Sequence, residues 1–230
     1  MRILPVKWAA VLGLALLAGC SQGPDGPTLE LEVFQLLQQR VASIGGAAAA
    51  PVERPPLTRA ALDTVEGPYI EVTVENRDIF AYLSQQLVRR DDSPGEIVVW
   101  RTEDNITLTL RSGVLVATRG LGDDILSASA PVATGKPGPV MGGARSYQIR
   151  GLDNKTHALV MVCSLLDLGP APVEIVEVTY PTRHMQERCE TQNSLVVNDY
   201  WVDSRSGRVW QSRQWAGPTI GYLRIRQLTI

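Results

Sequence analysis

Histidine and phenylalanine are scarce in this chain of 230 residues, with two of each, and cysteine occurs three times. Neither His157 nor His184 lies in an HExxH segment or another metal-ligand spacing. The sequence contains no Gly-x-Ser-x-Gly segment, and Gly135-Lys136 lacks the glycine and the hydroxyl residue that complete a phosphate-binding loop. We therefore expect no metal and no cofactor. Each histidine is either a general base or, as we prefer, a structural side chain.

Adjacent carboxylates occur twice, as Asp91-Asp92 and Asp123-Asp124. A glycosidase needs two carboxyl groups roughly 5 to 9 Å apart on either side of its substrate. Neighbouring residues of a strand point to opposite faces of the sheet, so neither pair suits that task by itself. We interpret both pairs as solvated loop charges and expect no catalytic residue, although scattered carboxylates could still form a site that no motif shows.

The N-terminal residues have the features of a secretory signal. Arg2 and Lys7 precede an apolar run, Trp8 to Leu17, that is shorter than the about 20 residues needed to span a bilayer. The segment ends in Leu17-Ala18-Gly19-Cys20, which resembles the lipobox of bacterial lipoproteins. We predict cleavage after residue 19 and acylation of Cys20, so that acyl chains hold the protein on a membrane. The alternative is a secreted protein with a chance cysteine near its cleavage site.

Cleavage would leave 20 basic and 24 acidic residues, a net charge of −4. This balance argues against a nucleic-acid partner, since such binding rests on Lys and Arg contacts to phosphate. With Cys20 acylated, Cys163 and Cys189 form an even pair in an oxidising compartment, which predicts a disulfide. Two buried free thiols are the alternative.

The mature chain is predicted to begin with a flexible tether, residues 20–28, which is rich in Gly and Pro. Residues 29–230 are expected to form a single, mainly β domain. The alternative is two β subdomains divided near residues 128–143. Apolar residues at a helical period predict a helix from Leu29 to Ile44, before a proline-rich loop at residues 47–56.

From Tyr69 onward, short runs of β-branched and aromatic residues alternate with turn residues, which is typical of an antiparallel all-β fold. We expect a sandwich or an open, barrel-like arrangement. Residues 79–90 fit a helix as well as a strand. The remaining predicted strands are 70–74, 97–101, 107–110, 114–118, 147–150, 158–165, 173–180, 195–203, 208–214 and 222–228.

The C-terminal third gathers aromatic residues among arginines. Aromatic faces beside hydrogen-bonding groups suit a polysaccharide groove. The alternative is that the aromatic side chains belong to the core and the arginines to the wet face. The residues concerned are Tyr200, Trp201, Trp210, Trp215 and Tyr222, with Arg205, Arg208, Arg213, Arg224 and Arg226.

Two stretches together carry a family resemblance. The first is Trp100-Arg101-Thr102 with Asp104 and the run 108–125, LTLRSGVLVATRGLGDDI. The second is 198–203, NDYWVD, followed by 207–214, GRVWQSRQ, and Gly217-Pro218. They resemble the YjbF, or GfcB, family of bacterial lipoproteins. The resemblance implies an all-β outer-membrane lipoprotein encoded with exopolysaccharide or group 4 capsule genes, and it implies no established activity.

Within the resemblance, Arg119, Asp123 and Asp124 are candidates for an exposed, charged contact surface, or else they shape a turn. Trp201, Trp210 and Trp215 are further candidates for that surface. The preferred hypothesis is a non-enzymatic accessory factor on the periplasmic side of the outer membrane that binds polysaccharide or an export protein; Ser21 after the acylated cysteine favours this membrane. A glycan-modifying enzyme and a purely structural envelope module are the alternatives.

Overall fold

The computed structural model describes residues 57–136, 138–151, 153–191 and 193–230. The signal segment, Cys20, the tether and the helix predicted at residues 29–44 lie outside the described residues. The first described element is the short helix α2 (Arg59–Leu62), whose N-cap Thr58 accepts a hydrogen bond from the backbone N–H of Ala61. None of the described helices has the length and apolar character needed to cross a membrane.

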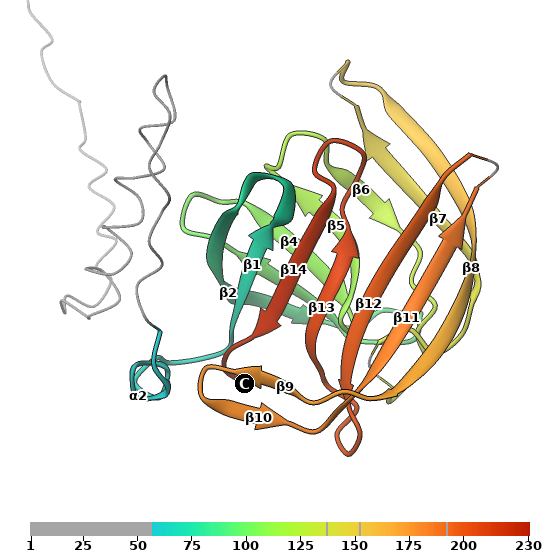
Figure 1. Ribbon diagram of the computed structural model, residues 1–230. Coiled ribbons are helices and arrows are strands. Elements are labelled where there is room, and N and C mark those ends of the chain that lie inside the picture. The colour runs from blue at the N-terminus through green and yellow to red at the C-terminus, as the bar shows by residue number, and fades with distance from the viewer. Residues whose placement is uncertain (1–56, 137, 152, 192) are drawn as a thin grey trace, which may run out of the picture. The chain divides into compact units, whose positions relative to one another are not determined.

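Twelve strands form one antiparallel sheet in the order β5-β4-β3-β2-β1-β14-β13-β12-β11-β8-β7-β6 (Figure 1). A separate hairpin is made of β9 and β10. The elements before the loop at 129–142 are β1 (Tyr69–Val74), the 3-10 turn η1 (Glu75–Arg77), β2 (Ile79–Arg89), β3 (Ile97–Arg101), β4 (Thr107–Arg111), β5 (Val114–Arg119) and β6 (Ile125–Ala128). Those after it are β7 (Gly143–Arg150), β8 (Thr156–Pro170), β9 (Val173–Ile175), β10 (Val178–Tyr180), β11 (Thr182–Glu190), β12 (Leu195–Asp203), β13 (Val209–Trp215) and β14 (Tyr222–Gln227).

The sheet curls into a nearly closed, barrel-like form whose two edge strands, β5 and β6, are consecutive in the chain. No strand ladder joins β5 to β6 in the described sheet. Side chains bridge the two strands instead. The Thr118 hydroxyl accepts from the N–H of Ile125 at 3.0 Å, and the Arg119 guanidinium donates to the carbonyl of Ile125 at 3.0 Å. We call this junction the seam.

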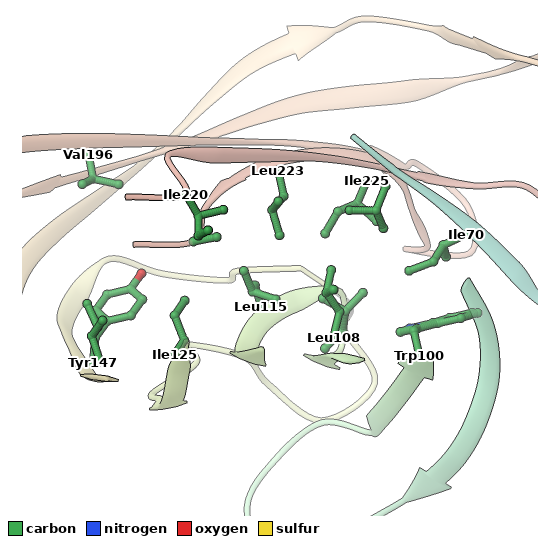
Figure 2. Close-up of a cluster of buried hydrophobic side chains, with 14 of the residues drawn as sticks. Ile70, Trp100, Leu108, Leu115, Ile125, Tyr147, Val196, Ile220, Leu223 and Ile225 are labelled. Carbon is green, nitrogen blue, oxygen red and sulfur yellow. The ribbon is translucent and has the colours of Figure 1, made fainter. Parts of the chain in front are cut away.

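The core fills the inside of the curled sheet. Figure 2 shows Ile70, Ile220, Leu223 and Ile225 in one row facing Trp100, Leu108, Leu115, Ile125 and Tyr147 in another. Alternation along the strands sends these side chains inward, except for Ile220, which reaches the core from the turn before β14. Each aliphatic or aromatic group so buried stabilises the fold by roughly 1.5 to 3 kcal/mol.

A smaller apolar cluster lies on the outer face, where α2 and the β9–β10 hairpin cover the sheet. Its buried members are Leu62, Val173, Ile175, Trp210 and Leu228. The pairing of β12 with β13 shifts register so that Trp201 faces Gln211 but Val202 faces Val209. This β-bulge places Trp210 in the outer cluster, whereas Ser212, two residues on, lines the inside.

The all-β prediction is confirmed, and residues 79–89 form a strand rather than a helix. The single strand predicted at 173–180 is wrong, because Val176 and Glu177 have positive φ angles of 45° and 66° and turn the chain into a hairpin. Strands β6 and β11 were not predicted. The strands on both sides of the loop at 129–142 belong to the same sheet, since β6 pairs with β7.

Candidate functional site

A cavity of about 440 Å³ lies at the end of the curled sheet where the β4–β5 and β12–β13 turns meet. This volume falls in the range of roughly 300 to 1,000 Å³ that is usual for small-ligand sites. We call it the mouth cavity. Its apolar and glycine lining is Pro68, Ile70, Val88, Val98, Trp100, Leu110, Gly113, Val209, Ile225 and Ile230, and its polar lining is Gln85, Glu96, Ser112, Ser206, Arg208, Ser212 and Gln227.

Trp100, one of the residues that line the cavity, carries a buried hydrogen-bond donor. The side chain comes from β3, opposite Leu108 of β4, and is 4% exposed. Its indole Nε1 has no hydrogen-bond partner among the described residues. A buried N–H without a partner is destabilising by about 1 to 3 kcal/mol, so a cavity beside such a group is a candidate for an acceptor ligand.

The turn between β12 and β13 positions Arg208 at the cavity. Asp203 holds this turn, since its carboxylate accepts the backbone N–H groups of Ser206 at 2.7 Å and Arg205 at 2.8 Å. The hydrogen bond from Ser206, and to a smaller extent that from Arg205, lowers the pKa of Asp203 below its usual range. The Arg208 guanidinium carbon lies 5.6 Å from the centre of the Trp210 ring, a cation–π distance.

Most other polar groups of the cavity already have partners. The Glu96 carboxylate pairs with Arg90 at 3.3 Å, and the Gln227 amide donates to the carbonyls of Tyr69 and Thr229. The Ser212 hydroxyl accepts from Gln214 at 2.9 Å. Glu96 is the one carboxylate side chain among the described residues that line the cavity. The lining therefore lacks the pair of facing carboxylates that hydrolysis of a glycosidic bond requires.

A buried ion pair lies deeper inside the sheet. Arg145 and Glu187 are 2% and 0% exposed, and their nearest side-chain atoms are 3.4 Å apart. Arg145 also donates to the Tyr147 hydroxyl at 2.9 Å, while Asn198 donates to Glu187 at 2.9 Å. Burial raises the pKa of the Tyr147 phenol, which therefore stays neutral.

A second group of buried hydrogen bonds reaches the mouth cavity. The Tyr200 hydroxyl and the N–H of Leu115 both donate to the Gln214 side-chain oxygen, at 3.1 and 2.8 Å. The Gln214 nitrogen donates to the carbonyl of Gly113, which lines the cavity. Burial also raises the pKa of Tyr200 well above its usual value, so its hydroxyl stays a donor. The carbonyl of Gly113 at the cavity is thus held by hydrogen bonds that run through Gln214 to Leu115 and Tyr200.

The predicted exposure of the Asp123-Asp124 pair is wrong, because the two residues are 4% and 8% exposed. The Asp124 carboxylate accepts from the Thr118 hydroxyl at 2.9 Å and from the N–H groups of Gly120 and Leu121 at 2.9 and 3.2 Å. Asp123 accepts a hydrogen bond from the Thr219 hydroxyl. Arg119 is exposed, but its guanidinium donates to backbone carbonyls across the seam. These residues hold the two edge strands together, and their role as a contact surface stays a prediction.

We expect Asp124→Ala to lower the free energy of unfolding by about 2 kcal/mol, because it leaves the buried Thr118 hydroxyl and the part-buried N–H groups of Gly120 and Leu121 without their acceptor. Chemical denaturation monitored by tryptophan fluorescence measures the loss. Asp92→Ala is the matched control, since Asp92 is exposed and substitutions at such positions change stability by less than about 0.5 kcal/mol. Equal stability of the two variants would contradict the assigned role of Asp124 at the seam.

The three candidate tryptophans are not brought together into one groove. Trp210 stacks on Tyr180 in the outer cluster, with ring centres 3.6 Å apart, and Trp201 stacks on His184 with ring centres 4.6 Å apart. Trp215 packs edge-on against Tyr147 at 5.4 Å beside the main core. The surroundings of these three side chains therefore agree better with a role in packing than with a polysaccharide groove.

The other polar candidates have structural partners as well. His184 lies 2.7 Å from Asp199, and His157 lies 3.4 Å from Asp153. Arg111 forms a two-pronged ion pair with Asp91 and holds the pKa of that carboxyl far below its usual range. These pairs do not converge on the mouth cavity.

The predicted disulfide is present. Cys163 of β8 and Cys189 of β11 face each other across the sheet, with Cα atoms 3.9 Å apart, and form an S–S bond. Both residues are buried beside Glu187. The sulfur atoms are therefore engaged with each other rather than available as metal ligands.

The fold and the cavity define the class: an all-β protein whose single antiparallel sheet is nearly closed around an apolar core, with a small cavity at one end. Residues 26–228 match the model of the YjbF family, described as group 4 capsule polysaccharide lipoprotein gfcB. The chain belongs to this lipoprotein family. Lipoproteins of this kind are anchored to a membrane.

A solved structure supports the fold. The crystal structure of the hypothetical lipoprotein YmcC from Escherichia coli (K12) is similar with a TM-score of 0.64 and 16% sequence identity, over 91% of this chain and 98% of that chain. No curated protein matches the sequence.

Sequence reasoning missed Trp100 as a site residue and overlooked Arg145 and Glu187 altogether. The sequence does contain a signal for the ion pair. Arg145 lies on the same face of its strand as Tyr147 and Ile149, and Glu187 lies on the same face as Cys189. A charge at an inward position of a strand indicates a buried partner. No comparable signal identifies Trp100, because a tryptophan in a strand is ordinarily a core residue.

Proposed function

We propose that this protein is a non-catalytic accessory factor in capsule or exopolysaccharide production or export, and that it binds a saccharide segment in the mouth cavity. It acts from the periplasmic side of the outer membrane, held there by acyl chains on Cys20. The family supplies the link to capsule polysaccharide. The cavity supplies a place for the ligand within the chain.

The unpartnered indole N–H of Trp100 is the observation that carries the proposal. A sugar offers hydroxyl and ring oxygens that can accept this hydrogen bond, and its C–H faces suit the aliphatic walls formed by residues such as Ile70 and Leu110. A lone, ion-paired carboxylate in the lining supports binding over hydrolysis.

A second candidate, an interaction module for an export protein, is favoured by a different observation. The outer face of β8 exposes a row of aliphatic side chains, among them Val160 at 62%, Val162 at 71% and Leu168 at 52%. Exposed apolar residues gathered on one strand are more often found at protein interfaces than scattered single ones. This face does not include any residue of the mouth cavity, so saccharide titration separates the two candidates.

Replacing Trp100 with Phe tests the saccharide site. Phenylalanine keeps an aromatic ring but removes the N–H donor, so we expect binding to weaken by about tenfold, the effect of one hydrogen bond of about 1.4 kcal/mol. The measurement is calorimetric titration of the full mature chain in detergent with oligosaccharides prepared from the exopolysaccharide of the producing cells. Circular dichroism verifies that the variant is folded.

Trp201→Phe is the matched control, because Trp201 packs against His184 and does not line the cavity. We expect this variant to bind as the wild type does. If Trp201→Phe weakens binding and Trp100→Phe does not, the saccharide site lies on the outer aromatic surface instead. If the wild type binds no oligosaccharide of the producing cells, the proposed function is wrong.

A further inference from the structure

We infer that the mouth cavity selects an acidic saccharide, with the negatively charged group of one sugar unit held by Arg208. This inference rests on the proposed function and adds the chemical class of the ligand. It follows from which polar groups of the cavity have partners within the protein and which do not.

The two charged side chains of the lining differ in whether they have a partner of opposite charge. Arg208 forms no ion pair with a carboxylate of the described residues, although its guanidinium lies against the face of Trp210. The indole N–H of Trp100 has no acceptor. The acidic group of the lining, Glu96, is already paired with Arg90. The charge that the cavity leaves unpaired is therefore positive.

The position of Arg208 suits recognition of a ligand at the rim. The backbone around it is fixed, since Asp203 accepts hydrogen bonds from the turn and the N–H of Asp203 donates to the carbonyl of Arg208 at 2.7 Å. Its partly buried side chain is supported by the Trp210 ring. Ordering of the guanidinium before binding reduces the entropy lost when it contacts a ligand.

A guanidinium that meets an anion in a half-buried site makes charge-assisted hydrogen bonds, which are stronger than those between neutral groups. A carboxylate or a phosphate ester on a sugar could occupy that place, while ring oxygens of the sugar lie toward Trp100. A neutral sugar would leave the Arg208 charge with only a hydroxyl as its partner. The cavity should therefore distinguish an acidic saccharide from its neutral counterpart.

Short oligogalacturonates and their methyl esters are suitable probes, because esterification removes the charge and keeps the sugar chain. We expect the full mature chain in detergent to bind the acid at least tenfold more tightly than the ester in calorimetric titration. The preference should shrink as salt concentration rises, since screening weakens the ionic contact. Inorganic phosphate at equal concentration should not displace the oligomer.

Arg208→Gln should abolish the preference by weakening binding of the acid about tenfold while leaving binding of the ester unchanged. Arg205→Gln is the matched control: Arg205 lies in the same turn, is exposed and does not line the cavity, so this variant should keep the preference. Equal binding of acid and ester by the wild type, or displacement by phosphate, overturns the inference and leaves the proposed function intact. If oligosaccharides from the producing cells also fail to bind, both are wrong.

Discussion

Replacing Glu187 with Gln is expected to lower the free energy of unfolding by about 3 to 5 kcal/mol, because it leaves the Arg145 charge buried without its counter-charge. The two side chains are 2% and 0% exposed, so water cannot take the place of the carboxylate. Glutamine has the same shape, which separates the effect of charge from that of packing. Urea denaturation followed by circular dichroism measures the change.

Two further variants show whether the charge is responsible. Glu190→Gln on the same strand removes an exposed carboxylate and should change stability by less than about 0.5 kcal/mol. The double variant Arg145→Met/Glu187→Leu replaces both charges by apolar side chains of similar size, and such exchanges are often neutral or stabilising. It should therefore be more stable than Glu187→Gln. A double variant that is less stable than the single variant would contradict this account of the pair.

The alternation of residues along the chain predicted most of the sheet, because strands with one face toward a core show it directly. Strand β11 was missed since it follows Pro181 and carries charged residues on both of its faces, among them Arg183, Glu187 and Arg188. Its place in the sheet depends on pairing with both β8 and β12. Residue patterns within β11 do not contain that information.

The seam was misjudged for a related reason. Two glycines and two aspartates within the five residues 120–124 are typical of an exposed turn, and Gly120 and Gly122 do have positive φ angles of 91° and 109°. The closing of the sheet buries the two aspartates of the turn, because β5 and β6 are brought together as its two edges. Asp124 then becomes the acceptor for the turn's own backbone, a role that the local sequence cannot distinguish from a solvated charge.

Replacement of both Cys163 and Cys189 by Ala should lower stability by roughly 3 to 4 kcal/mol, as expected for a cross-link that closes a loop of this size. For a protein of this length, such a loss corresponds to a melting temperature about 10 °C lower. Differential scanning calorimetry measures it. Peptide mapping without reductant should recover the two cysteines joined, and two thiols that can be alkylated in the native, unreduced protein would contradict the bridge.

The position of the bridge also predicts where the structure loosens. β8 is long, and β7 runs beside it only from Thr156 to Cys163, whereas β11 runs beside it only from Val162 to Pro170. The two neighbours overlap at Val162 and Cys163, so the disulfide ties β11 to β8 where β8 passes from one partner to the other. Without it, β6, β7 and the first half of β8 can separate from β11 before the whole domain unfolds.

Hydrogen exchange in the double alanine variant should therefore speed up first in β6 and β7. Strands β1 and β14, which lie far along the sheet, should keep near-native protection under mildly denaturing conditions. An equal rise in exchange along every strand would show that the bridge acts only through the entropy of the unfolded chain.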